Sequence, residues 1–416
     1  MAISNIISAI GNNSGIYPLL VRDCCIEAPS KIIVARRENL KESREIANDA
    51  TRERFIDEYA TSAIWLGGIP ATEYITDKFI AKKGYNAGVS IKLFNGTEFQ
   101  SIEKNIEKFK NIQQQDVQKA VQDLIKTQNN RGVYEKLLTK KFFIATAIPT
   151  IIMGFVLPKL NFALTRKIRK SKEEAKQNIT ANYTFKGNKN FSQVTFTGNF
   201  ASSVANLITV DKMAISDGGL TVGRVSTSRN KDEAYVNAFR MIGSMILNFV
   251  TPKYIAKFLD NSANKIFKIN VNLDPIIFDN IEFLNAVQNK TLELPKSVKE
   301  SDILEFLDNN PNSLFSKFAQ KLKKVTYLQS GYRDPRKFVD TQDLAKLKTE
   351  IERFIELSAT TKNTKKFIEK AKYIKYGNIL ANVGISSFLL AFALPKAQYL
   401  FNKLITGSYT DPGLRK

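Results

Sequence analysis

The residues best suited to chemistry on an anionic ligand gather in one glycine-rich stretch, Asp217-Gly218-Gly219-Leu220-Thr221-Val222-Gly223-Arg224. Neighbouring glycines can turn several backbone N–H groups toward one point, and an arginine beside them adds a positive charge. The stretch lacks the Lys-Ser/Thr ending of a nucleotide phosphate loop, and glycine pairs are also typical of tight turns. We therefore expect either a turn or an anion nest, whose residues would be Gly218, Gly219, Gly223 and Arg224.

Other catalytic chemistry is limited by what the chain lacks. It contains no histidine, which removes the commonest general base and metal ligand and excludes Ser–His and Cys–His nucleophile systems. Its two cysteines, Cys24 and Cys25, are adjacent and fit small buried side chains in a reducing compartment. We predict no metal and no cofactor, and nothing marks an enzyme. An enzyme acting on a phosphorylated substrate near Gly218–Arg229 is the third functional hypothesis.

The charge balance points to anionic partners. The 416 residues include 62 Lys and Arg against 40 Asp and Glu, a net charge of +22. Such a surface is attracted to anionic lipid headgroups, to nucleic acid or to an acidic protein. A generally soluble, Lys-rich surface is the simpler interpretation, because net charge informs association rather than fold.

Four segments share one pattern, in which an apolar run is followed by a proline and a polar or basic continuation; they are 64–70, 153–159, 247–253 and 390–396. Two of these segments lie in longer uncharged runs. If the lysine after each proline snorkels, the runs extend over 142–164 and 379–401, near the roughly 20 residues that a spanning helix needs. The residues that characterise these candidate membrane segments are Phe142, Pro149, Gly154, Pro158, Ile379, Gly384 and Pro395.

Three interpretations of the two runs stay open: transmembrane helices, re-entrant or interfacial helices, and the core of a soluble protein. Basic residues flank both runs, and such clusters attract anionic headgroups. The candidate lipid contacts are Lys140, Lys141, Arg166, Lys167, Arg169, Lys170, Lys365, Lys366, Lys372 and Lys375. We expect a membrane location, at the cytoplasmic face or integral, with a cytoplasmic location as the alternative.

The remaining patterns predict a mainly α fold. Densely alternating charge over 31–60 favours a solvated helix face, and apolar spacing predicts helices over 101–128 and 341–358. Alternation over 183–197 suggests a small β-hairpin or a linker. We divide the chain into an N-terminal helical region (1–141), a first apolar segment (142–170), a mixed region (171–270), a helical soluble unit (271–375) and a second apolar segment with its tail (376–416).

These observations favour a membrane-anchored or membrane-associated structural or interaction protein, which contacts anionic lipid through its basic flanks and presents 271–375 to a protein partner. The alternative is a soluble basic helical protein that binds nucleic acid or an acidic partner. Basic and aromatic residues are interleaved best at Lys372, Tyr373, Lys375 and Tyr376, but no nucleic-acid-binding motif accompanies them.

Overall fold

The computed structural model describes residues 20–176, 209–269, 271–289 and 291–415, together with residues 6, 7 and 10. These residues form helices and connecting loops, with one isolated antiparallel bridge between Tyr327 and Arg333 and no strand within the described ranges. The predicted mainly α fold is therefore confirmed. The hairpin expected at 183–197 lies outside the described residues.

The chain divides into two compact units that interleave along the sequence. Unit 1 comprises Met1–Pro18, Asp77–Leu138 and Pro252–Ile385, and unit 2 comprises Leu19–Thr76, Thr139–Thr251 and Ser386–Lys416. The boundaries fall inside four helices: α5 (Ile69–Lys82), α8 (Arg131–Phe142), α14 (Thr251–Phe267) and α20 (Thr364–Phe388).

Unit 1 is a helical unit with an aromatic core. Its complete helices are η3 (Ile91–Asn95), α6 (Ile102–Phe109), α7 (Gln115–Asn129), α15 (Pro275–Phe278), α16 (Ile281–Asn289), α17 (Glu300–Asn309), α18 (Leu314–Lys321) and α19 (Thr341–Ala359). Phe354 of α19 is fully buried and lies 5.3 Å, ring to ring, from both Phe278 and Phe367. The helix expected over 341–358 is present as α19, whereas the helix expected over 101–128 is interrupted between α6 and α7.

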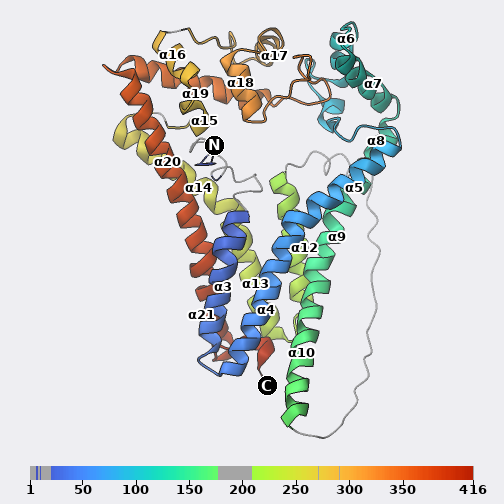
Figure 1. Ribbon diagram of the computed structural model, residues 1–416, viewed down its shortest axis with the longest axis vertical. Helices are drawn as coiled ribbons and strands as arrows, with labels where there is room; N and C mark the ends of the chain where they lie inside the picture. Colours follow the sequence, from blue (N-terminus) through green and yellow to red (C-terminus); the bar gives the residue numbers. More distant parts are fainter. Residues whose placement is uncertain are drawn as a thin grey trace. The chain divides into compact units, whose positions relative to one another are not determined.

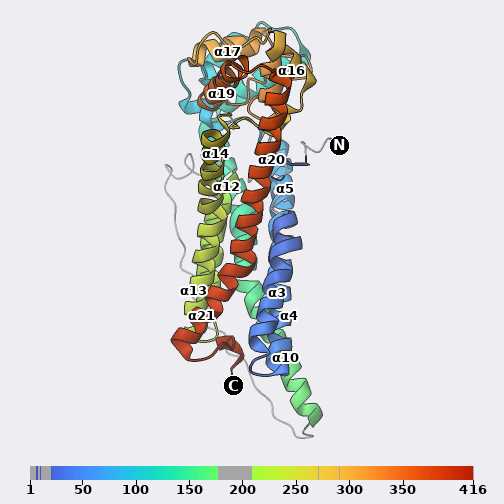
Figure 2. The same cartoon turned by 90° about the vertical axis from the view of Figure 1, so that its left-hand side faces the viewer.

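Unit 2 is a helical bundle. Its elements are η1 (Val21–Glu27), α3 (Ala28–Asn39), α4 (Arg44–Ala63), η2 (Ile64–Gly68), η4 (Phe143–Ala147), α9 (Ile148–Ile151), η5 (Ile152–Val156), α10 (Leu157–Lys176), α12 (Thr209–Ser226), α13 (Lys231–Met245), η6 (Ile246–Val250), η7 (Leu389–Ala393), α21 (Leu394–Thr406) and η8 (Pro412–Leu414). Figures 1 and 2 show α3, α4, α13 and α21 running side by side, and α3 packs on α4 and α13 on α21.

Short polar caps set the ends of these helices. Ser43 precedes α4 and its hydroxyl accepts a hydrogen bond from the Ile46 N–H at 3.1 Å. Asn230 caps α13 in the same way, with its side-chain oxygen 2.8 Å from the Glu233 nitrogen. Each side chain satisfies one of the N–H groups that a helix start leaves without a partner. The turns at α3–α4 and α12–α13 are therefore encoded locally.

A widened turn precedes the proline in most long helices of unit 2. Within the described residues, a π-helical turn ends two residues before each of Pro29, Pro70, Pro149, Pro158, Pro252 and Pro395. The residue before the proline often donates its N–H to the carbonyl five residues back, as Leu157 does to Ile152 and Leu394 to Leu389. A proline lacks an N–H and its ring collides with the carbonyl four residues back, so one extra residue in the turn removes the collision. The helices continue through their prolines.

Two helices are long and apolar enough to cross a bilayer, by length and composition. They are Arg131–Ser171 and Thr364–Thr406, which contain both runs expected from the sequence. In their most apolar windows 39% and 33% of the residues are buried within the chain. Less than half of each window therefore packs in the protein's own interior.

Candidate functional site

A line of carboxylates along α4 organises the interior of unit 2. Asp49, Glu53 and Asp57 are spaced four residues apart, which places them on one face of the helix. Each carboxylate receives arginines from other elements of the unit. Asp49, whose side chain is 1% exposed, pairs with Arg169 of α10 at 2.6 Å and with Arg52 at 2.8 Å. The line therefore ties α4 to its neighbours through charge rather than through apolar contact.

Arg229, in the turn between α12 and α13, binds two glutamates at once. Its two terminal nitrogens donate to the two carboxylate oxygens of Glu53, both at 3.0 Å, in the bidentate geometry that suits a guanidinium. It also donates to Glu233 at 2.7 Å and stacks on the ring of Phe162 at 4.1 Å. Gly413 lies directly against this group, because a Cβ at that position would collide with the side chains of Arg229 and Glu233.

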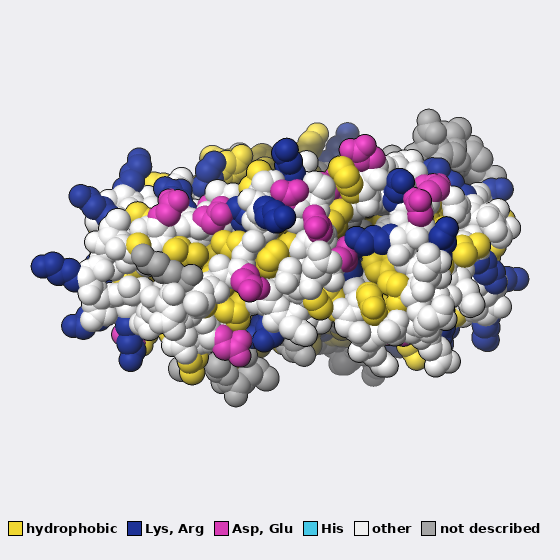
Figure 3. Space-filling model, turned by 90° about the horizontal axis from the view of Figure 1, so that it is seen from above, with side chains coloured by type: hydrophobic (Ala, Val, Ile, Leu, Met, Phe, Trp, Pro, Cys, Tyr) yellow, Lys and Arg dark blue, Asp and Glu magenta, His cyan; other side chains and the backbone are white. Residues whose placement is uncertain are grey.

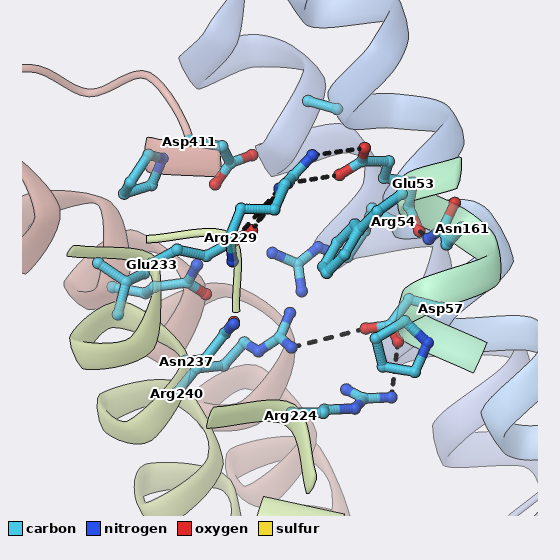
Figure 4. Close-up of a pocket in the computed structure, with 16 residues that line it drawn as sticks. Glu53, Arg54, Asp57, Asn161, Arg224, Arg229, Glu233, Asn237, Arg240 and Asp411 are labelled. Atoms are coloured by element: carbon cyan, nitrogen blue, oxygen red, sulfur yellow. Dashed lines mark hydrogen bonds and ion pairs between the residues drawn. The ribbon is translucent and has the colours of Figure 1, made fainter. Parts of the chain in front are cut away.

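Asp57 is shared by two further arginines. Arg224 of α12 binds one carboxylate oxygen at 2.6 Å, and Arg240 of α13 lies 3.5 Å from the other. Arg224 is 7% exposed and also donates to the Thr61 hydroxyl at 2.8 Å. The Nε atoms of Arg224 and Arg240 are buried and have no hydrogen-bond partner among the described residues. Figure 4 shows these two arginines, with Arg54 of α4, reaching toward one space from three helices.

The C-terminal stretch closes one side of this site. Asp411 accepts hydrogen bonds from the Tyr399 hydroxyl at 3.0 Å and from the Asn39 amide at 3.1 Å. The Asn230 amide donates to the Pro412 carbonyl at 2.9 Å. These bonds hold the segment after α21 against the ends of α3 and α13.

The space between these groups is a cavity of about 70 Å³. At roughly 10–15 Å³ for each water centre, it has room for several waters or a small ion. Its lining carries four arginines and four carboxylates, together with Asn161, Phe162 and Asn237; the charged members are Glu53, Arg54, Asp57, Arg224, Arg229, Glu233, Arg240 and Asp411.

Burial makes the pairing of these charges necessary. The side chains of Glu53 and Asp57 are 11% and 14% exposed, so both carboxylates have lost most of their contact with solvent. An ionised carboxylate away from water is costly unless opposite charges and hydrogen bonds replace its hydration. Arg229 supplies this replacement at Glu53, and Arg224 supplies it at Asp57. Removal of Arg229 would leave Glu53 buried without its arginine, and removal of Arg224 would leave Asp57 with Arg240 at 3.5 Å.

The glycine-rich stretch does not form the predicted nest or a turn. Gly218, Gly219, Gly223 and Arg224 all lie inside α12, where backbone N–H groups are used by the helix. Gly223 instead allows close helix packing, since a Cβ there would lie 2.7 Å from Cα of Gly154 in η5. Arg224 points to Asp57. Of these residues, Gly223 therefore serves helix packing and Arg224 serves an ion pair.

The membrane-segment residues fall in different environments. Pro149, Gly154, Pro158 and Pro395 are buried in unit 2, and Phe142 is half-buried at the end of α8. Ile379 is half-buried in α20, and Gly384 is exposed with no atom within 4 Å of the position of a Cβ. A neighbouring helix therefore approaches closely at Gly154, and within the described part of the chain none does so at Gly384.

Ion pairs engage several of the predicted lipid-contacting residues. Arg169 binds Asp49, Lys375 binds Asp260 at 2.6 Å and Lys372 binds Asp279. The exposed members of the set are Lys140, Arg166, Lys167, Lys170, Lys365 and Lys366, and Lys141 is half-buried.

The sequence alone did not predict the ion-pair site around Asp49, Glu53 and Asp57. The charges of 31–60 were expected on a solvated face, but Asp49 is buried and the side chains of Glu53 and Asp57 are nearly so. The signal that could have found them is the spacing of four residues between the carboxylates, on a helix with few large apolar residues to bury.

No protein-family model matches the chain, and no curated protein or solved structure matches it either. Among the described residues, no group of three or more Cys, Asp or Glu side chains is placed to hold a metal ion.

Proposed function

We propose that unit 2 is embedded in a lipid bilayer, with the exposed basic residues beside its two long apolar helices contacting anionic headgroups. One observation carries the proposal: the polarity of these helices is reversed relative to a soluble bundle. Many large apolar side chains face outward, and many of the buried side chains are small or polar.

The first helix has the reversed polarity over its whole apolar run. The outward residues of 144–164 are Ile144, Ile148, Ile151, Ile152, Val156, Lys159, Leu160, Ala163 and Leu164, and the buried ones are Ala145, Thr146, Pro149, Thr150, Met153, Gly154, Pro158 and Asn161. The outward stripe covers about 20 residues, or roughly 30 Å of helix, which equals the thickness of a bilayer's hydrocarbon core. A soluble protein rarely exposes an apolar surface of this length.

The second helix repeats the arrangement within unit 2. Phe388, Phe392, Leu400 and Leu404 are exposed, with Leu404 at 76%. The buried side chains include the polar Ser386, Ser387, Gln398 and Asn402 beside the apolar Leu390, Leu394 and Tyr399. Polar side chains in membrane proteins face the bundle interior, where they find partners.

Small residues where helices touch also support a lipid environment. Gly223 of α12 faces Gly154 of η5, and the hydroxyls of Thr150 and Ser216 are hydrogen-bonded at 2.6 Å. Without a hydrophobic force between helices, close packing of small residues and interhelical hydrogen bonds hold membrane helices together.

The nucleic-acid alternative has weaker support. Lys372 and Lys375 are paired with carboxylates, and Tyr376 is 8% exposed, so this stretch offers few groups for stacking or phosphate contact. On the face shown in Figure 3, Lys and Arg are spread out and interspersed with Asp and Glu rather than gathered in one patch. Binding of a protein partner by 271–375 stays a prediction.

The test is extraction of a membrane fraction with carbonate, made with two variants. An embedded wild-type chain stays in the pellet. Ile152→Lys places a charge at the middle of the outward stripe, which costs about 2.5–3.5 kcal/mol in a bilayer and releases chain from the pellet. Val298→Lys, at an exposed position of unit 1, is the matched control and changes nothing. Complete extraction of the wild type, or equal behaviour of Ile152→Lys and wild type, would refute the proposal.

The headgroup contacts are tested separately, by flotation with vesicles. When the chain is transferred from detergent to a mixture of the two kinds of vesicle, replacing Lys140 and Lys167 by Gln should lower its preference for phosphatidylglycerol over phosphatidylcholine vesicles, by about 1 kcal/mol for each charge. An unchanged distribution between the two kinds of vesicle would show that these residues do not contact anionic lipid.

A further inference from the structure

We propose that the cavity in unit 2 is a binding site for a small oxyanion, such as phosphate or a short carboxylate. The feature that carries this inference is a surplus of guanidinium donors on one wall. All the residues involved lie in one unit, so the inference does not depend on lipid insertion.

The donors come from Arg54, Arg224 and Arg240, on three different helices. Arg54 contacts the Tyr399 hydroxyl and lies 3.5 Å from Glu58, and Arg240 lies 3.5 Å from Asp57. Both distances exceed the roughly 2.7–2.9 Å of a good charge-assisted hydrogen bond. The Nε groups of Arg224 and Arg240 add two buried donors without a partner among the described residues.

The carboxylates of the lining are already occupied. Both oxygens of Glu53 accept from Arg229, and both oxygens of Glu233 accept from the same residue. Asp411 accepts from Tyr399 and Asn39. This leaves Asp57 as the single lining carboxylate that contacts Arg224 and Arg240, so the donors of this wall that have no partner face no free carboxylate of the lining.

The shape and the remaining polar group define the ligand. A volume of about 70 Å³ suits an ion of a few heavy atoms and not a nucleotide. Asn161 lines the cavity, and its side-chain oxygen is buried without a partner among the described residues. A partly protonated phosphate offers both acceptors for the arginines and a donor for Asn161.

The test measures binding to the purified full chain in a neutral detergent. Sodium phosphate and sodium acetate are titrated separately at constant ionic strength, with chloride as the balancing anion, and the melting temperature and equilibrium dialysis of labelled phosphate or acetate are recorded. We expect saturable stabilisation by at least one oxyanion, and the two titrations show whether phosphate or carboxylate is preferred. Absence of saturable binding of either would overturn the proposal.

Three variants locate the site. Arg240→Gln removes an under-used donor, and we expect it to weaken binding about tenfold to a hundredfold, as loss of a hydrogen bond to a charged group does. Asn161→Asp adds a negative charge with almost no change in shape and should weaken binding similarly. Arg52→Gln is the matched control, because Arg52 pairs with Asp49 on the same helix as Arg54 but does not line the cavity. Circular dichroism checks that each variant is folded. Unchanged affinity in both Arg240→Gln and Asn161→Asp, or an equal loss in Arg52→Gln, would refute the site.

Discussion

The packing of α12 on η5 can be tested with two glycines of the same helix, one that touches η5 and one that does not. Gly223 lies against Gly154, and a Cβ added at Gly223 would come within 2.7 Å of Gly154 backbone atoms. Gly218, also inside α12, has nothing within 4 Å of the same position. Alanine therefore raises the helix propensity by the same amount at both positions. It introduces a steric clash at Gly223 only.

The expected magnitudes follow from these distances. A Gly→Ala change in a helix interior stabilises it by about 0.8–1.0 kcal/mol. Ordinary van der Waals contact begins near 3.4 Å, so the helices must separate by about 0.7 Å to accept a methyl group at position 223. Overpacking of this kind costs about 1–3 kcal/mol, and backbone cannot rotate away as a side chain can. We expect Gly218→Ala to stabilise unit 2 by up to about 1 kcal/mol. We expect Gly223→Ala, in which the same gain offsets part of the overpacking cost, to destabilise it by up to about 2 kcal/mol.

The assay is thermal unfolding of the full chain in detergent, followed by circular dichroism. A difference of about 1–3 kcal/mol between the variants corresponds to roughly 2–12 °C for a unit of this size. If Gly218→Ala and Gly223→Ala raise the melting temperature by the same amount, α12 and η5 do not touch at Gly223. Small residues would then not explain how these two helices pack.

Three further predictions concern other parts of the chain. Phe354→Ala should destabilise unit 1 by about 3–5 kcal/mol, measured by thermal unfolding, because it empties a fully buried aromatic site; a loss below about 1 kcal/mol would contradict the described core. The hydrogen bond from Lys324 lowers the pKa of Asp343 below its ordinary value of 3.8, so Asp343 contributes stability above that pH and loses it as the pH falls through the lowered pKa. The melting-temperature difference between wild type and Asp343→Asn should therefore shrink on acidification, and a difference that grows would reverse the sign. Gly413→Ala should displace the C-terminal stretch from Arg229 and speed its cleavage in limited proteolysis, whereas an unchanged cleavage rate would show that the contact is not needed.

The sequence predicted those parts of the fold that depend on local pattern. Apolar spacing located α19, and the absence of charge located the two long apolar helices. The hydrogen bonds of Ser43 and Asn230 show why helix starts are readable, since a cap acts within three residues.

The site could not be predicted in the same way, because its partners are distant in sequence. Glu53 and Arg229 are 176 residues apart, and nothing near either residue specifies the other. Alternating charge on α4 indicates solvation only if the helix faces water, and that depends on tertiary packing. The glycines of α12 were misassigned for a related reason, since a glycine can serve a turn or a close helix contact and only the facing helix decides which.

The widened turns before the prolines limit which substitutions and deletions these helices can accept. One additional residue rotates everything beyond it by about 100°, so the two halves of each helix present different sides to the same neighbour. Replacing Pro395 alone would leave the additional residue of η7 in place and keep that offset. A straight helix with the same contacts would need the proline replaced and one residue deleted together. The number of residues in each widened turn therefore depends on the proline that follows it. Deletion of one residue there should be tolerated only when the adjacent proline is also replaced.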